Sequence, residues 1–273
     1  MTKITRKNIK SPIKPTWCPG CGNFGITRAL HKAMQDMELG REEVMLTFGV
    51  GCCDNGADFN LTYGIHSLHG RSVPPAIGAK LANHDLKVIS VSGDGGQYGE
   101  GLNHLMFAAR GNHNITMLVH NNNRYSLTTG QASPTTEKGT VTKTTPEGLI
   151  EHPLSTALTA HATFVARAYA NDFKQLTAII KEAVQHRGYA LVDILQPCVT
   201  FNKQYDFKWY KEHVEHLPED HDSSDWNAAM ELATKPAGKL FTGIYYQDEE
   251  TKAYHEQLED LEKETLVSQW QAD

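Results

Sequence analysis

Five cysteines are the first residues in this sequence whose type and spacing could do chemistry. Cys18 and Cys21 form a Cys-Pro-Gly-Cys pair, a spacing found both in metal sites and in redox-active dithiols. The pair by itself leaves three kinds of site open, namely structural zinc, an iron–sulfur cluster and a thioredoxin-like dithiol. A structural zinc ion needs four ligands, and Cys52 and Cys198 could complete that set. Cys53 follows Cys52 directly and is predicted to point elsewhere.

A second group of polar residues combines a carboxylate with amide side chains. Gly-Asp-Gly at 93–95 follows one apolar run, and Asn-Asn-Asn at 121–123 follows the next run along the chain. A carboxylate, an amide oxygen and a backbone carbonyl form a hard oxygen set that suits Mg²⁺ together with phosphate oxygens. The glycines beside Asp94 allow the backbone to approach a diphosphate closely. A lone Gly-Asp-Gly is more often a simple turn, but its pairing with the asparagines favours a magnesium–diphosphate site.

An alternation of strands and helices must position these residues. Near-continuous apolar strands between helices are typical of a doubly wound α/β layer with a mostly parallel sheet. Ligands of such sheets lie beyond the carboxyl ends of the strands, so both polar clusters are predicted at one edge. The predicted strands are Val44–Phe48, Lys87–Ser92, Ile115–His120, Thr163–Tyr169 and Ala190–Leu195. The predicted helices are Phe24–Glu38, Pro75–Asn83, Gly101–Arg110 and Asp172–Arg187, the last with Asp172 as its N-cap.

Two other segments differ from this pattern. Residues 126–150 are polar, threonine-rich and without periodicity, which favours a functional loop over a mobile surface excursion. Beyond residue 200 the pattern weakens, so we predict an α/β domain over 1–200 and a C-terminal extension over 201–273. The extension is predicted to include an acidic helix, Asp248–Glu264.

Charge is unevenly distributed along the chain. The total of −6 arises in the segment Asp248–Asp273, whose 9 acidic and 2 basic residues carry −7 and leave +1 for the rest. The first 14 residues contain five Lys or Arg and no acid. A nearly neutral body argues against a nucleic-acid-binding protein. No apolar run approaches the roughly 18 residues of a membrane span. Because no apolar stretch follows the basic N-terminus, the five cysteines indicate a reducing cytoplasm.

The order of several motifs resembles one enzyme family. Gly-Asp-Gly with asparagines some two dozen residues later resembles the thiamine diphosphate (ThDP) motif. Together the motifs resemble the β subunit of a 2-oxoacid:ferredoxin oxidoreductase, which implies a ThDP-binding diphosphate-domain fold with a C-terminal extension. The motifs are WCPGCGN at 17–23, GVGC at 49–52, HGR at 69–71, GDG at 93–95, TGQASPTT at 129–136 and PCVTFNK at 197–203.

The resemblance implies roles for individual residues. It implies that Asp94, Asn122 and the carbonyl of Arg124 bind Mg²⁺, and that four cysteines bind a 4Fe–4S cluster. Those cysteines are Cys18, Cys21, Cys52 and Cys198. Residues that would hold ThDP are Val50, Gly51, Cys52, Cys53, His69, Gly93, Asp94, Gly95, Asn122, Ser126 and Leu127. Cys53 is interpreted as a lining or packing residue.

The resemblance also implies an activity and partners. The family oxidatively decarboxylates a 2-oxoacid with coenzyme A, which gives acyl-CoA, CO₂ and reduced ferredoxin. We expect 2-oxoglutarate as the substrate first and pyruvate second; Arg71 could supply a charge for the distal carboxylate or be structural. The glutamate that activates ThDP is expected on an α subunit. The chain would then be inactive alone and assemble as a dimer of heterodimers.

Two alternatives remain at this stage. One is the ThDP-binding half of a non-redox decarboxylase whose cysteines hold structural zinc. The other is a non-catalytic scaffold subunit that keeps the fold and binds no ThDP. Asp94 and Asn122 are both present, which speaks against the scaffold.

Overall fold

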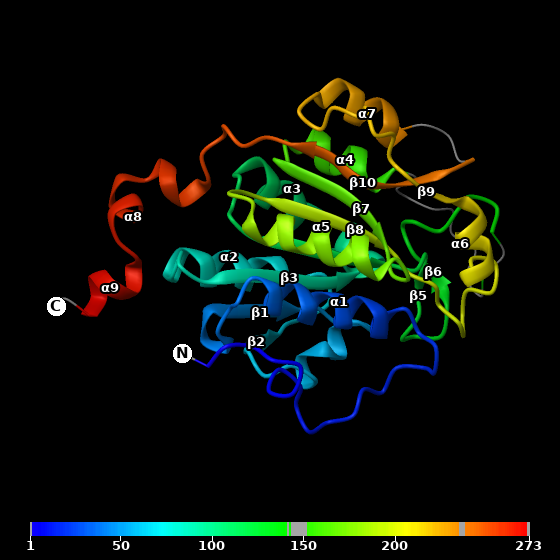
Figure 1. Cartoon of the computed structure of the whole chain (residues 1–273), viewed down its shortest axis with the longest axis horizontal. Helices are drawn as coiled ribbons and strands as arrows, with labels where there is room; N and C mark the ends of the chain where they lie inside the picture. The colour runs from blue at the N-terminus through cyan, green and yellow to red at the C-terminus, as the bar shows by residue number, and fades with distance from the viewer. Residues whose placement is uncertain (1, 141, 143–151, 235–237, 272–273) are drawn as a thin grey trace.

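The fold is built around one mixed sheet, seen in the computed structural model, which describes residues 2–140, 142, 152–234 and 238–271 (Figure 1). Within these residues the sheet has eight strands in the order β2-β1-β3-β4-β8-β7-β10-β9. The strands from β2 to β7 in this order are parallel, whereas β10 is antiparallel to β7. The strands are β1 (Val44–Phe48), β2 (Tyr63–His66), β3 (Lys87–Gly93), β4 (Thr116–Asn121), β7 (Phe164–Tyr169), β8 (Ala190–Leu195), β9 (Val214–His216) and β10 (Leu240–Gln247).

Helices cover both faces of the sheet (Figure 1). Because successive strand side chains point to opposite faces, Leu46 of β1 packs into one core and Met45 into the other. The first core lies under α1 (Asn23–Asp36) and α5 (Phe173–Gln185). The second lies under α2 (Val73–Ala82), α3 (Leu102–Arg110), α4 (Pro153–Thr159) and α7 (Trp226–Thr234). The remaining elements are a π-helical turn (Gly95–Glu100), the hairpin β5 (Arg124–Tyr125) and β6 (Gln131–Ala132), α6 (Phe207–His213), α8 (Glu259–Lys263), α9 (Leu266–Gln271) and 3₁₀ turns at Arg41–Glu43, Asp54–Asp58 and Tyr254–Gln257.

The predicted α/β class and mostly parallel sheet are confirmed. The five predicted strands and four predicted helices are present, with ends that differ by at most two residues. Asp172 caps α5 as predicted, because its side chain accepts the Gln175 N–H at 3.0 Å. The pattern did not reveal β2, an edge strand whose four residues are exposed and therefore lack an apolar face. The extension also adds β9 and β10 to the sheet, while its boundary at residue 200 stays a prediction.

The predicted helix Asp248–Glu264 is wrong. The chain from 248 to 253 forms turns, and helical structure begins only at the 3₁₀ turn Tyr254–Gln257 and at α8. The Asp248 carboxylate accepts the Glu250 N–H at 2.8 Å, which closes a turn. Asn112 Nδ2 donates to the carbonyls of Thr251 (3.2 Å) and Lys252 (3.1 Å), so these two carbonyls face the body of the protein instead of continuing a helix.

Two further predictions concern the long loop and membrane association. Of the loop 126–150, residues 126–140 and 142 are described; they include β6 and carry turns around it, and the remainder lies outside the described residues. Among the described helices none is long and apolar enough to cross a membrane.

Replacing Arg167 with methionine is expected to lower the free energy of unfolding by about 3–5 kcal/mol, because it leaves a buried charge unpaired. Arg167 Nε lies 2.9 Å from Oδ2 of Asp193, which is fully buried between β4 and β7. The other carboxylate oxygen accepts from Tyr98 Oη at 2.9 Å and Asn121 Nδ2 at 3.0 Å. Urea unfolding followed by circular dichroism measures the change.

A matched control uses an exposed ion pair of the same chain. Lys239 lies 2.6 Å from Glu215, and both side chains are about half exposed. Lys239→Met is expected to cost less than about 1 kcal/mol. Equal losses in the two variants would show that burial does not strengthen the Arg167 pair.

Candidate cofactor site

The two polar clusters meet at the carboxyl edge of the sheet. Strands β3 and β4 are parallel neighbours, with Gly93 opposite His120. Asp94 therefore follows β3 beside the residues that follow β4, and the Asn122 N–H points at Asp94 Oδ1 over 3.4 Å. The prediction that both clusters share one edge is confirmed.

Asp94 is a buried carboxylate with unequal oxygens. Its Oδ2 accepts from Ser133 Oγ at 2.5 Å and Thr135 Oγ1 at 2.6 Å, both from the loop after β6. Among the described residues, Oδ1 accepts only the long contact from the Asn122 N–H. Burial raises the pKa of Asp94 to about 6, against the hydrogen bonds, which lower it. A buried carboxylate with one weakly engaged oxygen fits a metal cation as its missing partner.

The asparagine turn after β4 is held by its own side chains. Asn122 Oδ1 accepts the Arg124 N–H and the Ser126 hydroxyl, each at 3.1 Å. The Arg124 guanidinium donates to the Asn123 carbonyl at 2.7 Å and to Thr136 Oγ1 at 3.2 Å. These contacts fix the segment that carries the second and third predicted magnesium ligands. The Arg124 carbonyl stays a predicted ligand.

The residues predicted to hold ThDP line a single cavity of about 150 Å³. It lies at the carboxyl edge of the sheet, where α/β proteins bind ligands. The predicted residues in its wall are Val50, Gly51, Cys52, Cys53, His69, Gly93, Asp94, Gly95, Asn122, Ser126 and Leu127. The other lining residues are Gly96, Arg124, Tyr125 and Thr128.

Two polar side chains of the cavity wall, His69 and Tyr125, both contact Glu100, which does not itself line the cavity. Because a carbonyl only accepts, His69 Nδ1 donates to the Val50 carbonyl at 2.7 Å, and Nε2 lies 3.1 Å from Glu100 Oε2. The Tyr125 hydroxyl donates to the same carboxylate oxygen at 3.2 Å. A Cβ atom on Gly95 would lie 2.4 Å from the Tyr125 ring, so glycine is required there by the aromatic side chain. The missing side chain thus makes room for Tyr125, and close approach of a diphosphate to these glycines stays a prediction.

Arg71 contacts the backbone of two other residues. Its Nη1 donates to the carbonyls of Gly70 at 3.1 Å and Glu100 at 2.6 Å. It does not line the cavity. Of the two roles considered for Arg71, the contacts support the structural one.

The Cys-Pro-Gly-Cys pair forms a tight turn before α1. Gly20 has φ of +82°, a left-handed conformation that favours glycine, and the Cys21 N–H donates to the Cys18 carbonyl at 3.0 Å. Asn23 at the start of α1 contacts His120 Nδ1 at 2.8 Å. Burial lowers the pKa of His120 to about 3, so this ring is neutral. The turn is thereby attached to the end of β4.

The four predicted cluster ligands share one electrostatic neighbourhood. Burial raises the pKa of Cys52 to about 12, and the neighbouring thiols add to the rise. These neighbours are Cys21, Cys198 and Cys18. Burial also raises the pKa of Cys21, partly offset by the Asn23 N–H. Burial and neighbouring thiols thus disfavour the thiolate forms of Cys52 and Cys21, and a bound metal cation would favour them.

Hydrogen-bond donors approach two of these sulfur atoms. Ser126 Oγ lies 3.3 Å from Cys198 Sγ, and Gln196 Nε2 donates to Cys21 Sγ at 3.5 Å. Such donors are the usual outer contacts of metal-bound thiolates. Cys53 differs, because it is buried and its Sγ donates to Asp54 Oδ2 at 3.4 Å.

The spacing of the thiols bears on which metal they fit. Among the described residues, no three His, Cys, Asp or Glu side chains converge closely enough to hold one metal ion. Tetrahedral zinc would bring its sulfur atoms to about 3.8 Å from each other, given Zn–S bonds of about 2.3 Å. An iron–sulfur cubane is larger than one ion and separates its thiolates further. Among the described residues the four thiols therefore do not form a tetrahedral zinc site as they stand, and the 4Fe–4S cluster stays a prediction.

Several residues of the site have roles that the sequence did not reveal. Ser133 and Thr135 belong to the motif TGQASPTT, but the motif alone assigns no role to these two hydroxyls. Glu100 and Gln196 had no predicted contact. Each of them contacts a residue at least 25 positions away, the shortest of these separations being that between Glu100 and Tyr125. No local pattern carries that information.

Comparisons with known proteins agree with this geometry. A family described as "Thiamine pyrophosphate enzyme, C-terminal TPP binding domain" matches residues 49–194. A second family, described as the C-terminal part of the pyruvate ferredoxin oxidoreductase beta subunit, matches residues 198–263.

Individual relatives share most of the chain. The 2-oxoacid:ferredoxin oxidoreductase subunit beta of Saccharolobus solfataricus is 40% identical, over 89% of this chain and 85% of its own. The 2-oxoglutarate oxidoreductase subunit KorB of Mycobacterium tuberculosis is 46% identical, over 72% of this chain and 53% of its own. A solved structure has a TM-score of 0.89 at 39% identity and covers 94% of this chain and 89% of its own. It is a 2-oxoglutarate:ferredoxin oxidoreductase from Magnetococcus marinus with 2-oxoglutarate, coenzyme A and succinyl-CoA bound. The chain therefore belongs to the 2-oxoacid:ferredoxin oxidoreductase β subunits.

Proposed function

We propose that this β subunit binds Mg²⁺–ThDP and a 4Fe–4S cluster and acts with an α subunit. The reaction is the oxidative decarboxylation of a 2-oxoacid with coenzyme A, with electrons delivered to ferredoxin. The observation that carries the proposal is the position of Asp94 and Asn122 on adjacent strand ends, over a cavity that also contains Cys52. The proposed diphosphate site and one proposed cluster ligand, Cys52, thus line the same cavity.

Asp94, Asn122 and the Arg124 carbonyl would hold Mg²⁺. Bound ThDP supplies the carbanion chemistry of decarboxylation, and the protein supplies binding and orientation. Ser133 and Thr135 orient the Asp94 carboxylate by fixing Oδ2, which leaves Oδ1 for the metal. His69, fixed by the Val50 carbonyl, would stand beside the cofactor.

Cys18, Cys21, Cys52 and Cys198 would hold the cluster. The hydroxyl of Ser126 joins the two sites, because it donates to Asn122 Oδ1 at 3.1 Å and its oxygen lies 3.3 Å from Cys198 Sγ. One residue, Ser126, therefore lies between a proposed cluster ligand and a proposed magnesium ligand. That proximity suits removal of electrons one at a time from the cofactor.

The small size of the cavity supports an α partner that would complete the cofactor pocket. Its volume of about 150 Å³ is below the roughly 300–1,000 Å³ of most cofactor pockets. The remaining walls, and the glutamate that activates ThDP, are proposed to come from the α subunit. We also propose a dimer of heterodimers and a cytoplasmic location, in keeping with the five cysteines, none of which is in a disulfide.

We propose 2-oxoglutarate as the substrate, with pyruvate second. The Magnetococcus marinus enzyme binds 2-oxoglutarate and coenzyme A, and the Mycobacterium tuberculosis relative is named for 2-oxoglutarate. The only cation in the described cavity wall is Arg124, whose guanidinium donates to Asn123 and Thr136. The charge that recognises the distal carboxylate is therefore proposed to lie on the α subunit.

The test is co-expression with an α subunit of this enzyme family, followed by assay of 2-oxoacids with coenzyme A and a low-potential dye. We expect dye reduction that requires coenzyme A and is fastest with 2-oxoglutarate. Iron and acid-labile sulfide are expected at about four each per β chain. One zinc ion per chain with decarboxylation but no dye reduction would instead support the non-redox alternative.

Thr135→Val is expected to raise the dissociation constant of ThDP in the presence of Mg²⁺ by about tenfold, because it removes a hydroxyl that orients Asp94. Thr128→Val is the matched control: Thr128 lines the cavity, but its hydroxyl bonds to Gln131 and Tyr125. Calorimetric titration of the αβ complex measures both constants. Equal ThDP dissociation constants for Thr135→Val and Thr128→Val would show that the Thr135 hydroxyl does not contribute to cofactor binding.

A further inference from the structure

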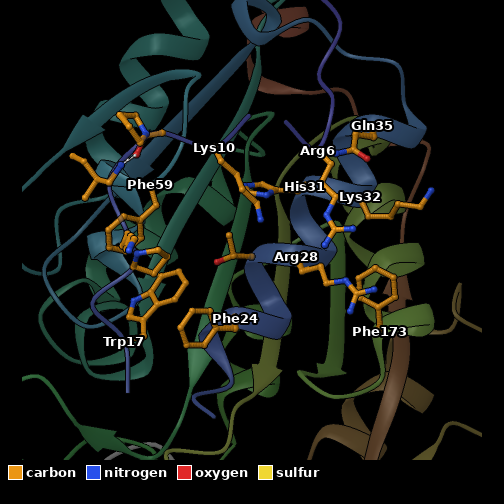
Figure 2. A pocket seen from close by; sticks show the side chains of 16 residues that line it. Arg6, Lys10, Trp17, Phe24, Arg28, His31, Lys32, Gln35, Phe59 and Phe173 are labelled. Atoms are coloured by element: carbon orange, nitrogen blue, oxygen red, sulfur yellow. Dashed lines mark hydrogen bonds between the residues drawn. The ribbon is translucent and has the colours of Figure 1, made fainter. Parts of the chain in front are cut away.

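A second cavity, of about 530 Å³, lies between the N-terminal segment and α1 (Figure 2). In Figure 2 the rings of Trp17, Phe24 and Phe59 gather at one end, and the cations Arg28 and Lys32 lie at the other. None of its lining residues belongs to the ThDP cavity. The proposed function leaves it, and the basic N-terminus, without a role.

The cavity is strongly cationic. Among the described residues, its lining contains five Lys or Arg side chains and no carboxylate; the five are Arg6, Lys10, Lys14, Arg28 and Lys32. Lys32 forms an ion pair with Asp36, and the Arg28 guanidinium lies 4.4 Å from the centre of the Phe173 ring. Among the described residues, no carboxylate forms an ion pair with Arg6, Lys10 or Lys14.

The charge of Lys10 acts on His31, another residue of the cavity lining. After burial, which is the main cause, Lys10 contributes to the lowered pKa of His31, whose Nε2 lies 2.5 Å from Asn60 Oδ1. Uncompensated cations around a concave wall concentrate the positive field there. The cavity and its rim therefore attract anionic partners.

This cationic surface adjoins the proposed cluster ligands. Trp17 lines the cavity, and its indole N–H donates to the Cys52 carbonyl at 2.5 Å. Phe24 and Phe59 pack edge-to-face on the indole, with ring centres 5.2 and 5.1 Å away. Cys18, next to Trp17, is exposed, whereas Cys198 is buried. One proposed cluster ligand, Cys18, is thus exposed directly next to a residue of the cationic cavity.

We propose that this surface docks an acidic electron-carrier protein. The proposal rests on the proposed function and assigns the place where electrons leave. Ile13 and Phe24, which are exposed at 53% and 42%, line the cavity together with the cations, and protein interfaces commonly combine apolar and polar side chains in this way. Basic surfaces steer acidic partners, and electron-transfer interfaces are small. One electron passes from the reduced cluster to the oxidised carrier, with no bond made or broken.

The test uses the αβ complex and an oxidised, acidic two-cluster ferredoxin as the probe. Lys10→Glu/Lys14→Glu is compared with Arg110→Glu/Lys208→Glu, which changes the charge equally at residues outside the cavity. Binding is measured by calorimetry at several ionic strengths. We expect the first variant to raise the dissociation constant about tenfold and flatten its salt dependence, and the control to change it less than twofold.

Dye reduction and assembly separate the possible failures. We expect both variants to reduce a small dye at the wild-type rate with 2-oxoacid and coenzyme A, and to elute as intact complexes. If the wild-type complex did not reduce the dye, the proposed function would be refuted. The docking surface would still be tested separately, by the ferredoxin-binding measurement. Unchanged ferredoxin affinity in Lys10→Glu/Lys14→Glu would refute the docking surface alone.

Two other results would assign this surface to a different occupant. Loss of the α subunit from Lys10→Glu/Lys14→Glu would refute the ferredoxin docking surface, because the surface would then be the interface between the α and β subunits. ADP serves as a probe for small anionic ligands. If ADP bound the wild-type complex but not Lys10→Glu/Lys14→Glu, and did not displace ferredoxin, the cavity would be a site for a small anion instead of the docking surface.

Discussion

Asp94→Ala is expected to abolish ThDP binding in the presence of Mg²⁺ while the iron content of the αβ complex stays unchanged. Asp94 is the only carboxylate in the wall of the described cavity. Mg²⁺ is bound through one or two carboxylates together with phosphate oxygens. Removing a neighbour of a metal ligand already costs 10–100-fold in affinity, so removing the ligand itself should exceed about 100-fold. Calorimetry and a colorimetric iron assay measure the two quantities.

Asp94→Asn separates charge from shape. The amide oxygen can still accept from Ser133 and Thr135, so the loop after β6 keeps its contacts. Alanine leaves these hydroxyls unpaired at a cost of about 1–3 kcal/mol. We expect both variants to lose ThDP, with Asp94→Asn closer to wild type in thermal unfolding. Exposed Asp58 provides a control, because Asp58→Asn lies outside the cavity and should bind ThDP normally. ThDP affinity of Asp94→Asn within threefold of wild type would contradict the metal assignment.

Cys198→Ser is expected to remove the cluster from the complex. Cys198 follows β8, is buried, and has its sulfur 3.3 Å from Ser126 Oγ. A cubane cluster needs four thiolates, and a serine hydroxyl at this position is a poor substitute for a soft ligand. We expect iron and acid-labile sulfide to fall from about four each per β chain to below one. The brown absorbance and dye reduction should be lost in parallel.

Cys53→Ser is the matched control within the same group of cysteines. Cys53 adjoins the proposed ligand Cys52, but its sulfur donates to Asp54, and burial raises its pKa well above the usual range. Serine can donate to Asp54 in the same way, so iron content should stay at the wild-type value. If Cys53→Ser lost its iron and Cys198→Ser kept it, Cys53 and not Cys198 would be the cluster ligand. Zinc in place of iron in the wild-type protein would show that the cysteines do not hold an iron–sulfur cluster.

Local patterns account for the part of the structure that the sequence determined by itself. Apolar runs such as Ala190–Leu195 specify buried strands, and the helical spacing behind Asp172 specifies α5. In a parallel sheet every strand ends at the same edge, so Asp94 and Asn122 had to lie close together once their strands were neighbours. The pattern failed for Asp248–Glu264, where Asn112 binds backbone carbonyls that a helix would need.

Contacts between distant segments were decided only by the tertiary structure. Thr135 reaches Asp94 across 41 positions and Ser126 reaches Cys198 across 72, and no periodicity encodes such pairs. The basic N-terminus likewise became a cavity wall only because Trp17 packs between α1 and Phe59 and binds the Cys52 carbonyl. The sequence determined the residue types and the order of elements, since both depend on neighbours along the chain. Which side chains pair across the site depends on the packing of the whole sheet.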